Sequence, residues 1–144
     1  MSRAMRRPGL LALAVLAACS GDDDNHQVFE FGPFDIAAQQ EVTGDCVQIS
    51  LHNRETIYVN TVELTTGPGF HHSNWFFVPE DTYAGPDGTW DCTERDFDEI
   101  AAALAGGVLF AQSTQSASDL QAFPPGVAVV IPPHSRVVGD VHLI

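Results

Sequence analysis

Six histidines occur in this chain of 144 residues, and two of them, His71 and His72, are adjacent. Imidazole nitrogens are common metal ligands, and a set of them without a thiolate suits copper or zinc. Adjacent residues on a regular strand point to opposite faces, so both rings can reach one ion only where the backbone is irregular. The Gly67-Pro68-Gly69 turn before the pair permits such an irregularity.

His142 is the third candidate ligand, because it interrupts an apolar run at residues 137–144. Together with the histidine pair it would complete a three-imidazole site. Intrinsic affinity favours copper over zinc at such a site, but spacing alone leaves both metals open. The remaining histidines are predicted to be structural or solvated: His26, His52 and His134.

The N-terminal residues have the layout of a secretory signal. Three arginines precede a short apolar run at residues 10–16, which leads into Leu16-Ala17-Ala18-Cys19. The run is too short to span a bilayer as a helix. Leu-Ala-Ala-Cys resembles the bacterial lipobox, in which the cysteine is acylated and becomes the first mature residue. An ordinary signal peptide, with Cys19 incidental, is the alternative.

The lipobox resemblance divides the chain into three parts. Residues 1–18 would be the signal peptide, residues 19–27 the acylated Cys19 with a flexible acidic tether, and residues 28–144 one folded domain. A multiply acylated cysteine anchors a protein stably. The resemblance also implies the outer membrane, because Ser20 stands where an Asp would favour inner-membrane retention. We therefore expect an exported protein held to the bacterial cell envelope by lipid.

The charge of the mature chain would be strongly negative. All 19 acidic residues lie beyond Cys19, and the remaining bases are Arg54, Arg95 and Arg136, which gives 3 − 19 = −16 with neutral histidines. Such a surface repels phosphate backbones, so nucleic acid is excluded as an expected partner.

The number of cysteines is consistent with export. If Cys19 carries lipid, Cys46 and Cys92 are left as an even pair in an oxidising compartment. A disulfide is one expectation for this pair, and two separate buried thiols are the alternative.

Short runs of alternating or β-branched residues predict an all-β fold with turns spaced for a sandwich or barrel. The predicted strands cover residues 28–31, 46–52, 56–66, 74–78, 127–131 and 137–144.

One short helix is predicted between these strands. It would begin near Thr93 and close at Gly106, with Phe97, Ile100 and Leu104 among the residues on its apolar face. Two stretches are predicted to be surface loops: residues 83–90 and 112–121.

These motifs, taken in order, resemble the N-terminal domain of the copper type II, ascorbate-dependent monooxygenases. That family includes peptidylglycine α-hydroxylating monooxygenase and dopamine β-monooxygenase. The shared elements are a strand-borne Cys46, the His71-His72 pair, a second cysteine at Cys92, and a closing strand that ends in His142. The resemblance covers residues 29–144, nearly the whole mature domain.

The resemblance implies an antiparallel, jelly-roll-like β-sandwich. It makes His71, His72 and His142 ligands of the copper that stores and delivers an electron, with ascorbate as donor. It also makes Cys46 and Cys92 one of the family's disulfides. The sequence departs from the vertebrate enzymes, which have more cysteines and follow the histidine pair with Met and Leu. It is therefore similar to a distant bacterial member, and its substrate is not implied.

The family's second copper site has no counterpart in this sequence. That site uses a His-x-His pair and a methionine on a second domain, whereas the methionines here are Met1 and Met5, inside the expected signal peptide. One hypothesis is the electron-transfer half of a monooxygenase that needs a second copper domain, from a continuation of the chain or another polypeptide. A non-catalytic protein for copper binding or delivery is the second hypothesis. A surface β-sandwich lipoprotein with incidental histidines is the third.

Overall fold

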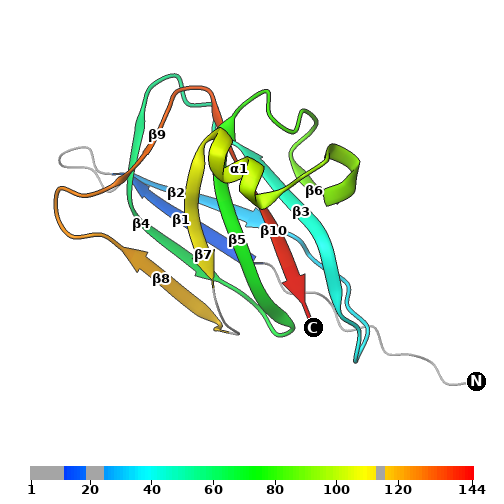
Figure 1. Cartoon of the computed structure of the whole chain (residues 1–144). Helices are drawn as coiled ribbons and strands as arrows, with labels where there is room; N and C mark the ends of the chain where they lie inside the picture. The colour runs from blue at the N-terminus through cyan, green and yellow to red at the C-terminus, as the bar shows by residue number, and fades with distance from the viewer. Residues whose placement is uncertain (1–11, 19–24, 113–115) are drawn as a thin grey trace, which may run out of the picture.

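A computed structural model of the chain describes residues 12–18, 25–112 and 116–144 (Figure 1). Strands dominate these residues, and every strand pairing is antiparallel. The strands form two five-stranded sheets that enclose a shared core. The all-β sandwich predicted from the sequence is confirmed.

The first sheet, sheet A, contains residues that the sequence assigns to the leader. Its strands are, in spatial order, β2 (Asn25–Phe31), β1 (Ala12–Ala18), β4 (Ile57–Thr65) and β8 (Ser118–Ala122), and β9 (Val129–Ile131) also pairs with β4. β1 therefore lies between β2 and β4. Residues 25–27 of the expected tether also belong to this sheet, because β2 begins at Asn25.

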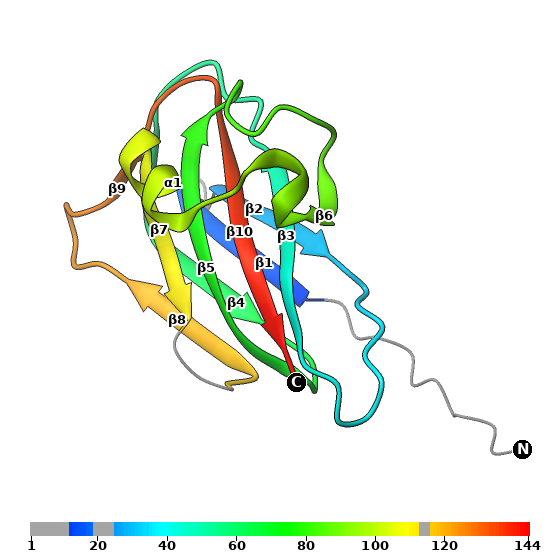
Figure 2. The same cartoon turned by 45° about the vertical axis from the view of Figure 1, so that its right-hand side comes forward.

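The second sheet, sheet B, places β10 at its centre. Its spatial order is β6 (Gly88–Asp91), β3 (Val42–Ser50), β10 (Ser135–Leu143), β5 (Phe70–Pro79) and β7 (Gly107–Gln112). Figure 2 shows β10 running between β3 and β5 toward the C-terminus. Both candidate strands for the histidines, β5 and β10, are thus adjacent in space.

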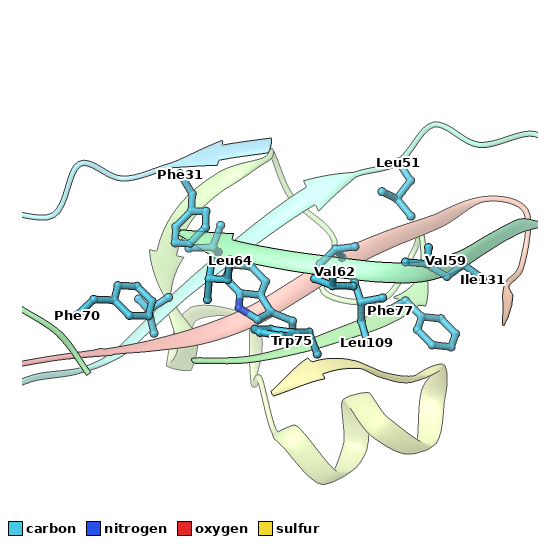
Figure 3. Packing of buried hydrophobic residues seen from close by; sticks show 14 of the residues in the cluster. Phe31, Leu51, Val59, Val62, Leu64, Phe70, Trp75, Phe77, Leu109 and Ile131 are labelled. Atoms are coloured by element: carbon cyan, nitrogen blue, oxygen red, sulfur yellow. The ribbon is translucent and has the colours of Figure 1, made fainter. Parts of the chain in front are cut away.

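Apolar side chains from both sheets meet in one core (Figure 3). Trp75 of β5 is 3% exposed, and its ring centroid lies 4.9 Å from that of Phe31 on β2. Alternate residues of a strand share a face, so Ser73 and Phe77, which are also buried, point inward with Trp75. It follows that His72 and Asn74 lie on the outer face of sheet B.

A second apolar cluster lies on that outer face, beneath the short helix α1 (Glu99–Ala105) and the 3-10 turn η1 (Cys92–Arg95). The disulfide between Cys46 of β3 and Cys92 of η1 is part of this cluster. The predicted disulfide is thus confirmed, and it crosslinks β3 of sheet B to the segment that leads into α1.

The helix differs from the sequence prediction in its start and in its buried face. Asp98 is its N-cap and accepts a hydrogen bond from the backbone N–H of Ala101 at 2.8 Å. Ala102 is fully buried, whereas Ile100 and Leu104 are 72% and 83% exposed. The predicted apolar face was wrong because η1 occupies the expected first turn and the helix begins only after it.

Besides β1, which the sequence assigns to the leader, three strands were not predicted from the sequence. β6 overlaps the stretch predicted as the first loop, β8 overlaps the second, and β7 was not predicted. β6 buries only Trp90 and β8 buries no residue fully, so neither shows the apolar periodicity that marks a half-buried strand. Within the described ranges, no helix is long and apolar enough to cross a membrane.

Candidate metal centre

The structure brings together the three histidines predicted as ligands. The ring centroids of His71, His72 and His142 lie 4.7–4.9 Å apart, and one nitrogen from each ring lies within 4.8 Å of the other two. Among the residues that the structure describes, this is the one group of three histidine, cysteine or acidic side chains with such spacing. Three neutral imidazoles at this spacing are a suitable donor set for a transition metal.

A β-bulge on β5 explains how adjacent histidines reach one point. His142 of β10 is opposite His72, but the next residue of β10, Leu143, is opposite Phe70. His71 is therefore an extra residue, so that two histidines of β5 oppose one histidine of β10. Phe70 and Leu143, which are opposite each other just beyond the bulge, both belong to the core. The bulge thus removes the strict alternation that would have separated the two rings.

The other neighbour of β10 also changes register at this point. Val141 is opposite Asp45 of β3, whereas Leu143 is opposite Val42, so two residues of β3 stand across from His142. One of these is Gly44, whose φ is +90°, a value that glycine adopts without a steric penalty. His142 therefore lies at the point where both flanking strands are irregular.

Glu41 fixes the orientation of the His142 ring. Its carboxylate oxygen Oε1 lies 2.8 Å from Nε2 of His142, and the His142 side chain is only 16% exposed. A carboxylate accepts hydrogen bonds, so the hydrogen-bond network assigns the proton to Nε2 and leaves Nδ1 with a free lone pair. This is the carboxylate–histidine arrangement that commonly orients a metal ligand.

The free nitrogen of His142 faces a nitrogen of His71. The two Nδ1 atoms are 3.3 Å apart. Two nitrogens about 2.0 Å from one ion at a tetrahedral angle are about 3.3 Å from each other. The separation and the nitrogen donor set therefore fit a bound copper or zinc ion.

The surroundings of His72 favour its neutral form. Burial lowers the pKa of His72 below its usual value, and the neighbouring His142 and His71 rings lower it further, against an opposing effect of Glu99. A histidine must be neutral to coordinate a metal. His72 is therefore in its ligand form at lower pH than an ordinary surface histidine.

Two carboxyl groups lie beside the histidines on the same face. Asn74, opposite Asp140 in the ladder, donates a hydrogen bond from Nδ2 to Oε1 of Glu99 at 2.7 Å. Burial and, after it, the charge of Glu99 raise the pKa of Asp140 to about 6. This acidic pair would attract a cation to the outer face of sheet B. The sequence did not predict these residues or Glu41, because each contact joins distant segments of the chain.

The other histidines lie outside the three-histidine cluster. His26 is exposed on β2. His52 and His134 are also exposed, as predicted, but both lie within 4 Å of Glu80, a convergence that the sequence did not reveal. Cys19, the predicted site of acylation, lies outside the described residues.

No family model, curated protein or solved structure matches the chain. The resemblance to the copper monooxygenases, and the functions that it implies, therefore remain predictions that depend on the motifs and on the geometry of the histidines.

Proposed function

We propose that this protein binds one copper ion through His71, His72 and His142 and transfers electrons at that centre. The observation that carries the proposal is the β-bulge, because it gathers three imidazoles from two neighbouring strands. Copper held by three imidazoles supplies a one-electron Cu(I)/Cu(II) couple.

The residues around the histidines have defined tasks in this proposal. Glu41 accepts the proton of His142 Nε2 and so presents Nδ1 as the donor. The lowered pKa of His72 keeps that ring neutral. The cluster is only partly buried, which leaves access for a small reductant such as ascorbate.

The wider role follows from the family resemblance. We propose that the chain is the electron-transfer half of an ascorbate-dependent monooxygenase that hydroxylates C–H bonds. Its partner would be a second copper domain, in a continuation of the chain or in a separate polypeptide. This chain alone is not expected to hydroxylate a substrate.

Copper capture or delivery without catalysis is the second candidate function. It is favoured by the sequence of the 144 residues, which contains no His-x-His and has its methionines at Met1 and Met5. The two functions differ in one property of the same site. An electron-transfer centre retains its copper through repeated reduction and oxidation, whereas a delivery protein releases it in one oxidation state.

Copper titration of the purified protein tests the shared part of both functions. We expect one tightly bound copper per chain, and at least tenfold weaker binding in each of His71→Ala, His72→Ala and His142→Ala. His26→Ala is the matched control, because it removes an exposed histidine from the other sheet. Unchanged affinity in His142→Ala would remove the third ligand, and no copper binding would favour a surface β-sandwich with incidental histidines.

Cycles of ascorbate and oxygen then separate the two candidates. After each cycle, the copper that remains with the protein is measured after gel filtration, and the Cu(II) spectrum reports the oxidation state. Full retention supports electron transfer, and loss of copper on reduction supports delivery.

We also propose that the protein is exported and anchored to the outer membrane through acylated Cys19. The lipobox-like sequence and the Cys46–Cys92 disulfide, which suits an oxidising compartment, support this location. Intact-mass measurement of protein from the membrane fraction should find an acyl adduct. A processed protein without that adduct would contradict the anchor.

A further inference from the structure

A second group of metal-binding side chains lies at the opposite end of β10. Nδ1 of His52 is 3.9 Å from Oε1 of Glu80, and Nδ1 of His134 is 3.8 Å from Oε2 of the same carboxylate. His134 immediately precedes β10, whereas His142 is near its end. At about 3.3 Å per residue, the two groups are about 26 Å apart along the strand. This second group is therefore separate from the three-histidine centre.

Main-chain hydrogen bonds tie these three segments together. The N–H of Glu80 donates to the carbonyl of His134 at 2.8 Å, and the N–H of His134 donates to the carbonyl of Asn53 at 2.8 Å. The buried Asn53 side chain also accepts a hydrogen bond from the N–H of Ser135. The backbones that carry His52, Glu80 and His134 are thus held in place, and only their side chains remain to be ordered by a ligand.

Both histidines have left-handed backbone conformations. The φ angle is +51° at His52 and +57° at His134. Positive φ is uncommon for residues other than glycine, although histidine tolerates it better than most. The backbone therefore leaves the extended conformation at both histidines, and each ring projects from a turn at the same end of the sheet. Such local backbone irregularity is often found at binding sites.

We propose that His52, Glu80 and His134 form a second site, which binds a divalent transition-metal ion such as Zn²⁺. Two imidazoles and a carboxylate are a donor set that zinc and copper both accept, with water completing the coordination. The nitrogen–oxygen separations exceed by about 0.5 Å the roughly 3.3 Å expected around a tetrahedral ion. The rings are 78% and 73% exposed, so they are free to rotate inward at small cost.

The second site binds more weakly than the three-histidine centre. The ligand atoms of the three-histidine centre all lie within 4.8 Å of one another, whereas those of the second site are farther apart. The exposed side chains must therefore lose rotational freedom when they bind the ion, and this entropy loss reduces the affinity.

A zinc titration of the full chain with the three-histidine centre disabled tests this inference. The background is the His71→Ala/His142→Ala variant, so the result does not depend on whether that centre binds copper. We expect one Zn²⁺ per chain by calorimetry. Adding His52→Asn or His134→Asn should weaken the affinity at least tenfold, and adding both should abolish binding. Asparagine is the chosen replacement because it tolerates the left-handed backbone that each histidine adopts.

His26→Asn in the same background is the matched control and should leave the affinity unchanged. As a second measurement, the imidazole NMR signals of His52 and His134 should shift together when Zn²⁺ is added to the unsubstituted chain, which remains informative if the background variant does not fold. Absence of zinc binding in a folded background variant would overturn the proposal. Unchanged affinity in both asparagine variants, or ring signals that do not move, would also overturn it and leave an ordinary histidine–glutamate contact.

Discussion

The two sheets of the sandwich differ in the parts of the chain that form them. All five strands of sheet B lie between residues 42 and 143, whereas an interior strand of sheet A, β1, is formed by residues 12–18. The sequence assigns those residues to a leader that would be removed. No pairing within sheet B involves β1, whereas loss of β1 would remove the β1 ladders of both β2 and β4 in sheet A. The histidine centre therefore lies on the sheet whose strand pairings do not include β1.

The outer faces of the two sheets differ in a similar way. Sheet B is covered by α1 and η1 and is crosslinked through Cys46 and Cys92. Sheet A instead exposes apolar side chains on its strands, including Tyr58, Leu120 and Val130. A metal site requires ligands that are held within a few tenths of an ångström, and the covered, crosslinked sheet provides that support.

Removal of the disulfide from sheet B should have the largest effect of the predicted changes, and it should lower the free energy of unfolding. The Cys46→Ala/Cys92→Ala variant should lose about 2–4 kcal/mol of unfolding free energy, because the crosslink no longer restricts the unfolded chain. Urea unfolding followed by tryptophan fluorescence measures the loss, since Trp90 lies in the same cluster as the disulfide. The unsubstituted protein in the presence of a reductant is the control. Equal stability of the variant and the oxidised protein, or free thiols at both positions in peptide mapping, would contradict the prediction.

Much of the fold could be predicted from the sequence because the strands that face the core carry a visible pattern. β2, β3, β4, β5, β9 and β10 all overlap strands expected from alternating or β-branched residues. The missed strands β6, β7 and β8 lie at the edges of the two sheets, where pairing with one neighbour determines the conformation. Such pairing leaves little periodicity in the sequence.

The site could be predicted only in part. His71, His72 and His142 were found because they interrupt apolar segments and follow a turn, and Gly69 does adopt a positive φ of +89°. Glu41 is separated from His142 by 101 residues and immediately precedes β3, so no local pattern in the sequence indicates the contact. The sequence likewise does not reveal the contacts of Glu80. His52 follows β3, Glu80 follows β5 and His134 precedes β10, and only the folded sheet brings these three residues together.

Deletion of the expected leader should distinguish the local stability of sheet A from that of sheet B. A chain that begins at Ser20 should lose at least tenfold protection from hydrogen exchange at amides of β2, equivalent to about 1.4 kcal/mol, because β1 no longer pairs with it. Amides of β3, β5 and β10 should keep their protection. Copper affinity should remain within about twofold of that of the full chain, whatever its absolute value.

The full-length chain with Cys19→Ser is the control for this experiment, since it lacks the same thiol but retains residues 12–18. An equal loss of protection in β10 would mean that the two sheets open as one cooperative unit. The distinction between a leader-dependent sheet and an independent sheet would then be wrong.

The smallest predicted effect concerns charge at the edge of sheet B. Asp45 of β3 is opposite Asp91 of β6, and burial followed by the charge of Asp91 raises the pKa of Asp45 above its usual value. A raised carboxyl pKa means that stability is lost as the pH rises through that pKa, because the ionised form is disfavoured in the folded protein. Asp45→Asn should therefore stabilise the protein at pH 7 by about 0.2–0.5 kcal/mol, a figure reduced for solvent screening.

Asp91 provides the contrast that makes this small effect interpretable. Its carboxylate accepts hydrogen bonds from the hydroxyl and the backbone N–H of Thr93, which lower the pKa of Asp91 and cap η1. Asp91→Ala removes the same repulsion but also the cap, so it should destabilise the protein at pH 7. Urea midpoints for both variants at pH 7 and pH 3 are the measurement. The gain from Asp45→Asn should vanish at pH 3, where the carboxyl is protonated. A gain of equal size at both pH values would show that packing of the amide, rather than loss of charge repulsion, explains the change at this edge of sheet B.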